Sequence, residues 1–166
     1  MKIEIFNEKK IKIRKISQSD LKKVKEFQEY INSLIEEEAM ISLKTKKSRK
    51  EERNWLKEKL KNIKKKKEVM LLAEDKGKIV GVAAIYLKTE RQSHVGEFGI
   101  SVRKEYRGIG LGKKLTKEIL KLAKKELKPK LKIVRLSVFS TNKIAQNLYK
   151  KFGFKMVAKI PKQIQY

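Results

Sequence analysis

Cysteine is absent from the chain, and histidine occurs only once among its 166 residues. Without cysteine the chain can form no disulfide, no thiolate metal site and no cysteine acyl-enzyme. A single histidine also leaves a structural zinc site without the ligands it needs. The fold therefore depends on a packed core, and we expect no metal in its chemistry.

Long apolar runs and a leader pattern are missing as well. The apolar segments are far shorter than the roughly 20 residues of a membrane-spanning helix, and the N-terminus does not resemble a signal peptide. We expect a cytoplasmic protein that does not bind membranes. The length and the 40% share of apolar residues predict one folded domain over residues 1–166.

Acidic residues are scarce beside basic ones. The chain has 45 lysines and arginines against 19 aspartates and glutamates, which gives a net charge of +26. This charge is typical of surfaces that bind nucleic acid or the ribosome. It is also typical of lysine-rich surfaces that only solvate helices, as in some proteins of heat-loving organisms. Because arginine, the better phosphate reader, supplies only 7 of the 45 cations, we favour the second interpretation.

Apolar periodicity and turn residues predict alternating strands and helices. The patterns Ser17-x-x-Asp20 and Ser48-x-x-Glu51 are capping boxes, each of which opens a helix. The other helices follow residue 110, ending near Leu127, and residue 142, ending before Gly153. The expected strands are 2–6, 11–16, 69–73, 79–87, 95–102, 133–139 and 154–160. The order indicates an α/β (α+β) fold, with a mixed, mostly antiparallel twisted sheet of about 6–7 strands and about 4 helices on both faces.

The most specific feature is the glycine-rich segment Tyr106–Lys113, between a predicted strand and a predicted helix. Glycines allow backbone N–H groups to approach a phosphate, and a helix N-terminus adds partial positive charge. Arg107 and Lys113 flank the turn and can neutralise a diphosphate. A Walker loop and a Rossmann fingerprint both require other spacings or another place in the chain.

Two motifs together resemble the GNAT N-acetyltransferases. The first is Gly99-Ile100-Ser101-Val102 followed by Arg107-Gly108-x-Gly110-x-Gly112. The second is Asn142…Ala145…Leu148-Tyr149…Phe152-Gly153-Phe154. The resemblance covers about residues 10–160 and implies the GNAT fold, with acetyl-CoA as co-substrate. It also implies transfer of the acetyl group to a primary amine, on a protein or a small molecule, by direct attack in a ternary complex.

The family normally adds a final strand, whereas this chain ends at Tyr166. We expect either a truncated chain or a partner, such as a second copy in a homodimer, that completes the sheet edge. The main alternative function is a non-catalytic basic module that binds nucleic acid and retains a coenzyme A site. Transfer of a longer acyl group, or transfer to a hydroxyl, stays open.

The resemblance also implies which residues bind the cofactor. The strand over 98–102 would splay from its neighbour, so that its backbone pairs with the pantetheine arm. Tyr149 matches the position of the acid that protonates the departing thiolate, and the alternative is a tyrosine of the core. Asn142 is expected to cap its helix and to contact the cofactor. The cofactor-binding set is Ile100, Ser101, Val102, Arg107, Gly108, Ile109, Gly110, Leu111, Gly112, Lys113, Asn142 and Tyr149.

The general base has two candidates. Glu97 lies in the strand that would face the acetyl group, and His94 lies three residues earlier. A histidine at the start of a strand is usually inert, so we rank Glu97 first, and removal of the proton through water stays open. Ribosomal alanine acetylating relatives use a glutamate near Leu136–Val138, and its absence here argues against that substrate.

Glu36, Glu37 and Glu38 form an acidic run in a chain that is poor in acid. In this fold the neighbouring helices build the acceptor wall, so the run predicts attraction of a cationic amine such as a protein lysine or a polyamine. The alternative is an ordinary solvated helix face.

Overall fold

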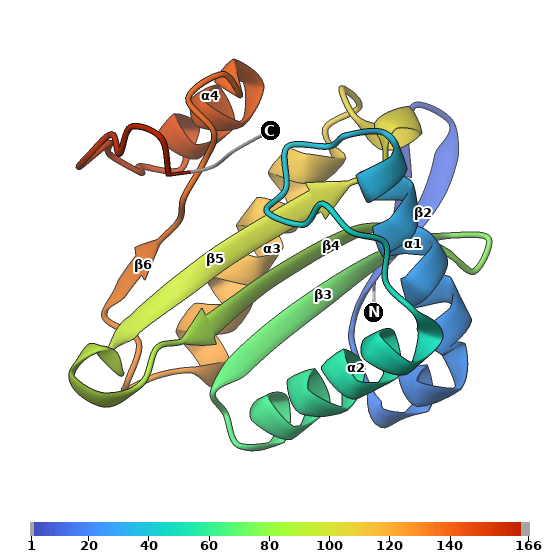
Figure 1. The fold of residues 1–166 in the computed structure, drawn as a ribbon, viewed down its shortest axis with the longest axis horizontal. Helices are drawn as coiled ribbons and strands as arrows, with labels where there is room; N and C mark the ends of the chain where they lie inside the picture. Colours follow the sequence, from blue (N-terminus) through green and yellow to red (C-terminus); the bar gives the residue numbers. More distant parts are fainter. Residues whose placement is uncertain (1, 164–166) are drawn as a thin grey trace.

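The computed structural model describes residues 2–163. The segments with alternating apolar residues form a six-stranded sheet, and helices lie on both of its faces (Figure 1). The strands are neighbours in chain order, and every pair is antiparallel except the last, which is parallel. This confirms the predicted mixed, mostly antiparallel sheet. The strands are β1 (Lys2–Phe6), β2 (Lys9–Lys15), β3 (Glu68–Asp75), β4 (Lys78–Leu87), β5 (Val95–Val102) and β6 (Ile133–Arg135).

Helices cover the two faces of the sheet unequally. Two helices pack on one face and one on the other, whereas the last lies beyond β6 (Figure 1). The helices are α1 (Val24–Glu36) and α2 (Arg49–Lys64) on the first face, α3 (Leu111–Glu126) on the second, and α4 (Lys143–Lys151). Three short 3-10 helices, η1 (Gln18–Lys23), η2 (Glu90–Gln92) and η3 (Lys104–Tyr106), join the other elements of the described chain.

Both predicted capping boxes form, but only one opens an α-helix. At Ser48 the hydroxyl accepts the Glu51 N–H at 3.2 Å, and the Glu51 carboxylate accepts the Ser48 N–H at 2.8 Å. The Ser17 box begins η1 instead, so α1 starts seven residues later than its cap, at Val24. The side chain of Asp20 in that box is buried, and its carboxylate forms an ion pair with Arg14 at 2.7 Å.

Strand alternation divides the core into two layers, since successive side chains point to opposite faces. The layer under α3 contains Leu71, Ile85 and Phe98, which pack with Leu115 and Ile119. The layer under α1 and α2 contains other residues of the same strands, including Met70, Leu72 and Ile79, with Phe27, Leu34, Leu56 and Leu60 from the helices.

A network of charged groups links β2, β3 and η1. The Arg14 guanidinium binds Asp20 at 2.7 Å and Glu74 at 2.7 Å, and Lys23 adds a contact of 3.3 Å to Glu74. Burial would raise the pKa of Asp20, but hydrogen bonds from Arg14 and Ser17 outweigh it and lower that pKa. The same guanidinium lowers the pKa of Glu74.

Two strand predictions near the C-terminus are wrong. The predicted strand 133–139 is paired only over β6, and the segment 154–160 forms no strand. Met156, Val157 and Ile160 are 84%, 96% and 64% exposed. Alternation alone predicted strands here, but a strand also needs a neighbour for its backbone hydrogen bonds, and in the described residues neither 136–139 nor 154–160 is paired with one. No helix of the described residues has the length and apolar character needed to cross a membrane.

Candidate active site

The last strand, β6, leaves the edge of β5 soon after it begins (Figure 1). The two strands pair over only three positions, from Val95↔Ile133 to Glu97↔Arg135. β5 continues to Val102 with its other edge paired to β4, whereas the chain after Arg135 runs toward α4. The outer backbone edge of 98–102 therefore has no strand paired to it in the described chain, and we call this separation of the two backbones the gap; it is the separation of strands that the resemblance implied.

The glycine-rich turn lies at the end of β5. Gly108 and Gly110 have φ of 77° and 90°, which side chains rarely adopt, and a Cβ at either would meet nothing within 4 Å. The first hydrogen bond of α3 joins Lys114 N–H to Gly110 C=O at 3.0 Å, so the amides of 111–113 precede the helical ladder. Open space and outward amides at a helix N-terminus suit a phosphate.

Asn142 caps α4, as predicted. Its Oδ1 accepts the Ala145 N–H at 3.1 Å. The same helix brings Leu148 close to the turn, where a Cβ at Gly112 would lie 3.7 Å from its Cδ2. The two motifs that carried the resemblance are therefore neighbours in space.

Arg107 is held by the protein itself. Its Nε donates to the Val102 carbonyl at 2.8 Å, and its guanidinium forms an ion pair with Glu37 from the end of α1. Arg107 thus ties α1 to β5, and part of its charge is offset. Lys113, on the first turn of α3, is exposed beside the glycines.

The acidic run after α1 is divided among separate contacts. Glu36 binds Lys46 at 2.7 Å, Glu37 binds Arg107, and Glu38 is exposed with a φ of 51°. Two of the three carboxylates are thus paired with cations of this chain, which weakens the pull of the run on an external amine.

Glu97 lies at the point where the strands separate. Its Oε2 accepts a hydrogen bond from Arg135 Nε at 2.7 Å, and its side chain is 19% exposed. Tyr86 is its cross-strand neighbour on β4. Burial, and then the charges of Glu97 and Glu68, raise the pKa of Tyr86.

Tyr86, Glu97 and Arg135 form a row across β4, β5 and β6. The row lies on the face of the sheet that α1 and α2 cover. Ser101 lies four residues after Glu97 on the same face of β5. Its hydroxyl forms a hydrogen bond with the Tyr30 hydroxyl of α1, with the two oxygens 2.8 Å apart. The Ser101 side chain therefore points to α1, whereas Ile100 and Val102 pack against the core layer under α3.

Tyr149 lies on the opposite face. Its ring contacts Phe98 and Phe154, with centroids 5.8 and 6.0 Å apart. Burial raises the pKa of its hydroxyl. Because Glu97 and Phe98 are successive strand residues that point apart, the Glu97 carboxylate and Tyr149 approach the gap from opposite faces.

His94 is exposed, and the structure does not bring it to the glycine turn. It precedes β5, where its carbonyl accepts the Lys132 N–H at 2.9 Å. Six residues of strand separate it from Ile100, a span of about 20 Å.

Arg135 is the residue that sequence reasoning missed. One cation among 45 carries no local signal, and its partner is 38 residues away. Only the register of β5 and β6 places the two side chains opposite each other.

Other features of the described chain lie away from this gap. Two grooves of about 80 and 210 Å³ are lined mainly by residues of β2, β3 and α3, with Glu4 of β1 and Ile63 of α2, and include no residue of the gap. Among residues 2–163, no three carboxylate or imidazole groups come together as metal ligands would.

Comparison with known proteins agrees with this geometry. A family model described as acetyltransferase (GNAT) family matches residues 30–154. An acetyltransferase of the GNAT family from Streptococcus pneumoniae is 26% identical, with a TM-score of 0.74 over 86% of this chain and 83% of that one.

Two further solved structures show the same fold. The yncA protein from Salmonella typhimurium, solved with its cofactor acetyl-CoA, has 18% identity and a TM-score of 0.76 over 94% of this chain and 86% of that one. A ribosomal-protein-alanine N-acetyltransferase from Brucella melitensis has 22% identity and a TM-score of 0.69 over 87% and 84%. No curated protein sequence matches the chain significantly.

Proposed function

This chain belongs to the acetyltransferase (GNAT) family, and we propose that it transfers the acetyl group of acetyl-CoA to a primary amine by direct attack in a ternary complex. One observation carries the proposal: β5 and β6 separate beside the glycine-rich turn, with Glu97 and Tyr149 on opposite faces of the gap. An acceptor can thus reach the thioester from one face while the thiol leaves on the other.

The chain offers suitable groups for the diphosphate and the pantetheine arm of acetyl-CoA. The amides of 108–113 and Lys113 suit the diphosphate, and the free edge of 98–102 suits the amide groups of the pantetheine arm. The Arg107 guanidinium would also neutralise the diphosphate, once the guanidinium has left its ion pair with Glu37. Acetyl-CoA itself supplies the activated thioester.

The side chains around the gap account for the protons of the reaction. The acceptor ammonium loses two protons as its nitrogen bonds to the acetyl carbon and the carbon–sulfur bond breaks. Glu97 takes the first proton and passes it to solvent, and Tyr149 donates to the sulfur and regains the second. Burial raises the pKa of the Tyr149 hydroxyl, so the group that faces the sulfur is the protonated phenol.

The test is calorimetric titration with acetyl-CoA at elevated salt, which suppresses the generic attraction of a +26 chain for polyanions. Gly110→Ala should weaken binding at least about tenfold, because it strains the turn that presents the amides. Gly77→Ala is the matched control, since Gly77 also has positive φ (81°) and open space but lies in the β3–β4 turn. Equal binding by both variants, or no binding by the wild type, would contradict the proposed site.

Tyr149→Phe separates chemistry from binding. It removes only the hydroxyl, so the packing on Phe98 and Phe154 stays. We expect turnover to fall at least about tenfold, with acetyl-CoA affinity unchanged. Unchanged turnover would remove Tyr149 as the acid.

A further inference from the structure

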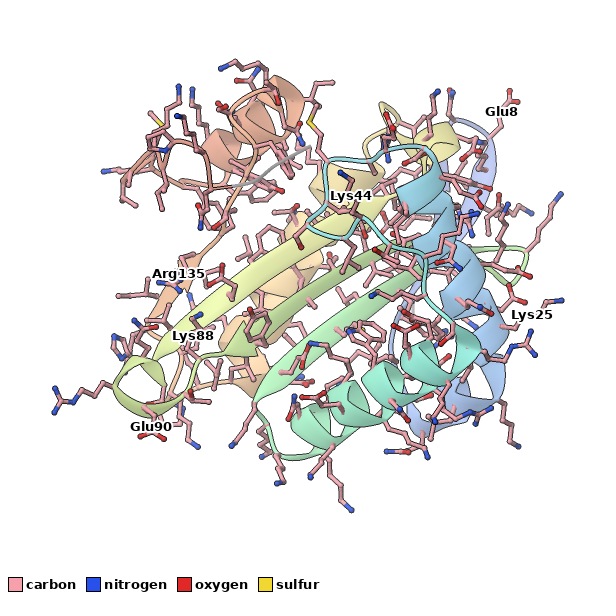
Figure 2. The ribbon with its side chains drawn as sticks, viewed as in Figure 1. Glu8, Lys25, Lys44, Lys88, Glu90 and Arg135 are labelled. Carbon is pink, nitrogen blue, oxygen red and sulfur yellow. The ribbon has the colours of Figure 1, made fainter. Side chains whose placement is uncertain are left out.

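Glu97 and Arg135 place one charge of each sign at the apex of the gap. They are the last paired residues of β5 and β6, and their side chains lie 2.7 Å apart. Arg135 is the more open partner, with its side chain 48% exposed against 19% for Glu97. Figure 2 shows Arg135 on β6, beside the edge of β5. An acceptor that reaches this apex meets both charges.

At the inner end of the row of Glu68, Tyr86, Glu97 and Arg135, the carboxylate faces a cation of the chain, although burial still raises the pKa of Glu68. Glu68, the cross-strand neighbour of Tyr86, is buried and forms an ion pair with Lys59 of α2 at 2.9 Å. The Lys59 ammonium also lies over the rings of Trp55 and Tyr86, at 5.8 and 5.2 Å from their centroids. The groups left for an acceptor are therefore the Tyr86 ring, the Glu97 carboxylate and the Arg135 guanidinium.

We propose that the acceptor is an α-amino acid, whose ammonium binds Glu97 and whose carboxylate binds Arg135. This inference rests on the proposed function and names its substrate class. An acceptor with an ammonium alone would have to displace Arg135 from Glu97 and would leave the guanidinium without its partner. An α-amino acid carries both charges on one carbon, so its insertion replaces one ion pair with two.

The chemistry of arginine favours this occupant. The hydrogen bond to Glu97 uses Nε of Arg135, and a guanidinium carries further donors in a planar fork that matches a carboxylate in two parallel hydrogen bonds. A polyamine or a lysine-rich peptide would instead bring additional positive charge next to Arg135 in a chain that already has a net charge of +26. The predicted attraction by Glu36, Glu37 and Glu38 is weakened by their own cation partners.

The experiment measures release of the coenzyme A thiol, for which a chain without cysteine gives no background. The panel contains the standard L-α-amino acids, spermidine and a lysine-containing peptide. The best amino acid is then compared with its carboxamide and its decarboxylated amine, which keep the amine but lose the carboxylate. We expect KM at least about tenfold higher for both derivatives.

Substitution of Arg135 gives the sharper test. Arg135→Gln should raise KM for the amino acid at least about tenfold but change KM for its carboxamide by less than about twofold, and Arg135→Lys should recover part of the loss. Arg91→Gln removes another exposed arginine, in η2, and should leave both values unchanged. The carboxamide comparison matters because a merely structural Arg135, one that only holds β6 to β5, would affect both acceptors equally.

Three results would overturn the inference. They are equal KM values for the amino acid and its derivatives, an equal effect of Arg135→Gln on all acceptors, and transfer only to spermidine or the peptide. In the last case the proposed acetyltransferase function stands. If the wild type binds no acetyl-CoA, both proposals fail.

Discussion

The chain up to Leu127 and the chain after it are built differently. The first part contains five strands with long pairings and both core layers, whereas no described side chain from 128 to 163 is buried. The contrast is plainest between two helices: α3 buries Leu111, Leu115, Thr116, Ile119 and Ala123, and α4 buries none of its residues. The first part therefore holds most of the folding free energy.

The difference also explains where the site lies. A sheet in which β6 followed β5 along its whole length would satisfy the backbone of 98–102 internally. Because β6 stops after three residues, that edge stays available, and the loosely attached α4 supplies Tyr149 and the cap at Asn142. The candidate site lies on the boundary between a rigid scaffold and a segment with few buried contacts, an arrangement common in ligand-binding sites.

The largest expected effect tests this contrast by stability. Leu115 is fully buried against β4, and Leu115→Ala should lower the free energy of unfolding by about 2–5 kcal/mol, because it leaves a cavity. Ile144, at 86% exposure in α4, should change it by less than about 0.5 kcal/mol when replaced by alanine. Urea unfolding measures both, and similar losses would show that the two regions share one core.

The next effect tests the charged network within the rigid part. Arg14→Met leaves two largely buried carboxylates without their main cation, and should cost about 3 kcal/mol near neutral pH.

The pH dependence gives this prediction its control. The pKa values of Asp20 and Glu74 are lowered in the folded protein, so their contribution is present above the unfolded pKa values near 4 and is lost as pH falls through the lower folded values. The melting temperature of the wild type should therefore fall on acidification below about pH 5. The fall should be smaller in Arg14→Met, and parallel profiles for the two proteins would refute the assignment.

The smallest effect lies at the boundary itself. Glu37→Gln releases Arg107 from an ion pair whose guanidinium is exposed, so the free energy of unfolding should change by less than about 1 kcal/mol. Acetyl-CoA should bind about threefold more tightly at low salt and with little change at high salt. Glu36→Gln removes the neighbouring charge, which contacts Lys46 instead, and should not show this gain. Equal gains would indicate a general field effect.

Local patterns predicted most of the fold correctly. The strand 95–102 and the Ser48 cap depend on residues adjacent in the chain, and both are confirmed. The glycine-rich turn also forms where the sequence predicts it, and Gly108 and Gly110 have the positive φ that glycine tolerates best. The strands 133–139 and 154–160 were overpredicted, since alternation says nothing about whether a neighbour is available to pair.

The sequence by itself determined the order of the elements through α4, the glycine-rich turn and the family, because each depends on residue spacing along a few turns of chain. Only the tertiary structure decided which charges meet. Arg107 finds Glu37 across 70 residues, and Arg135 finds Glu97 across 38. Such pairs follow from strand register and helix packing, which the whole core sets together, and so no local segment encodes them.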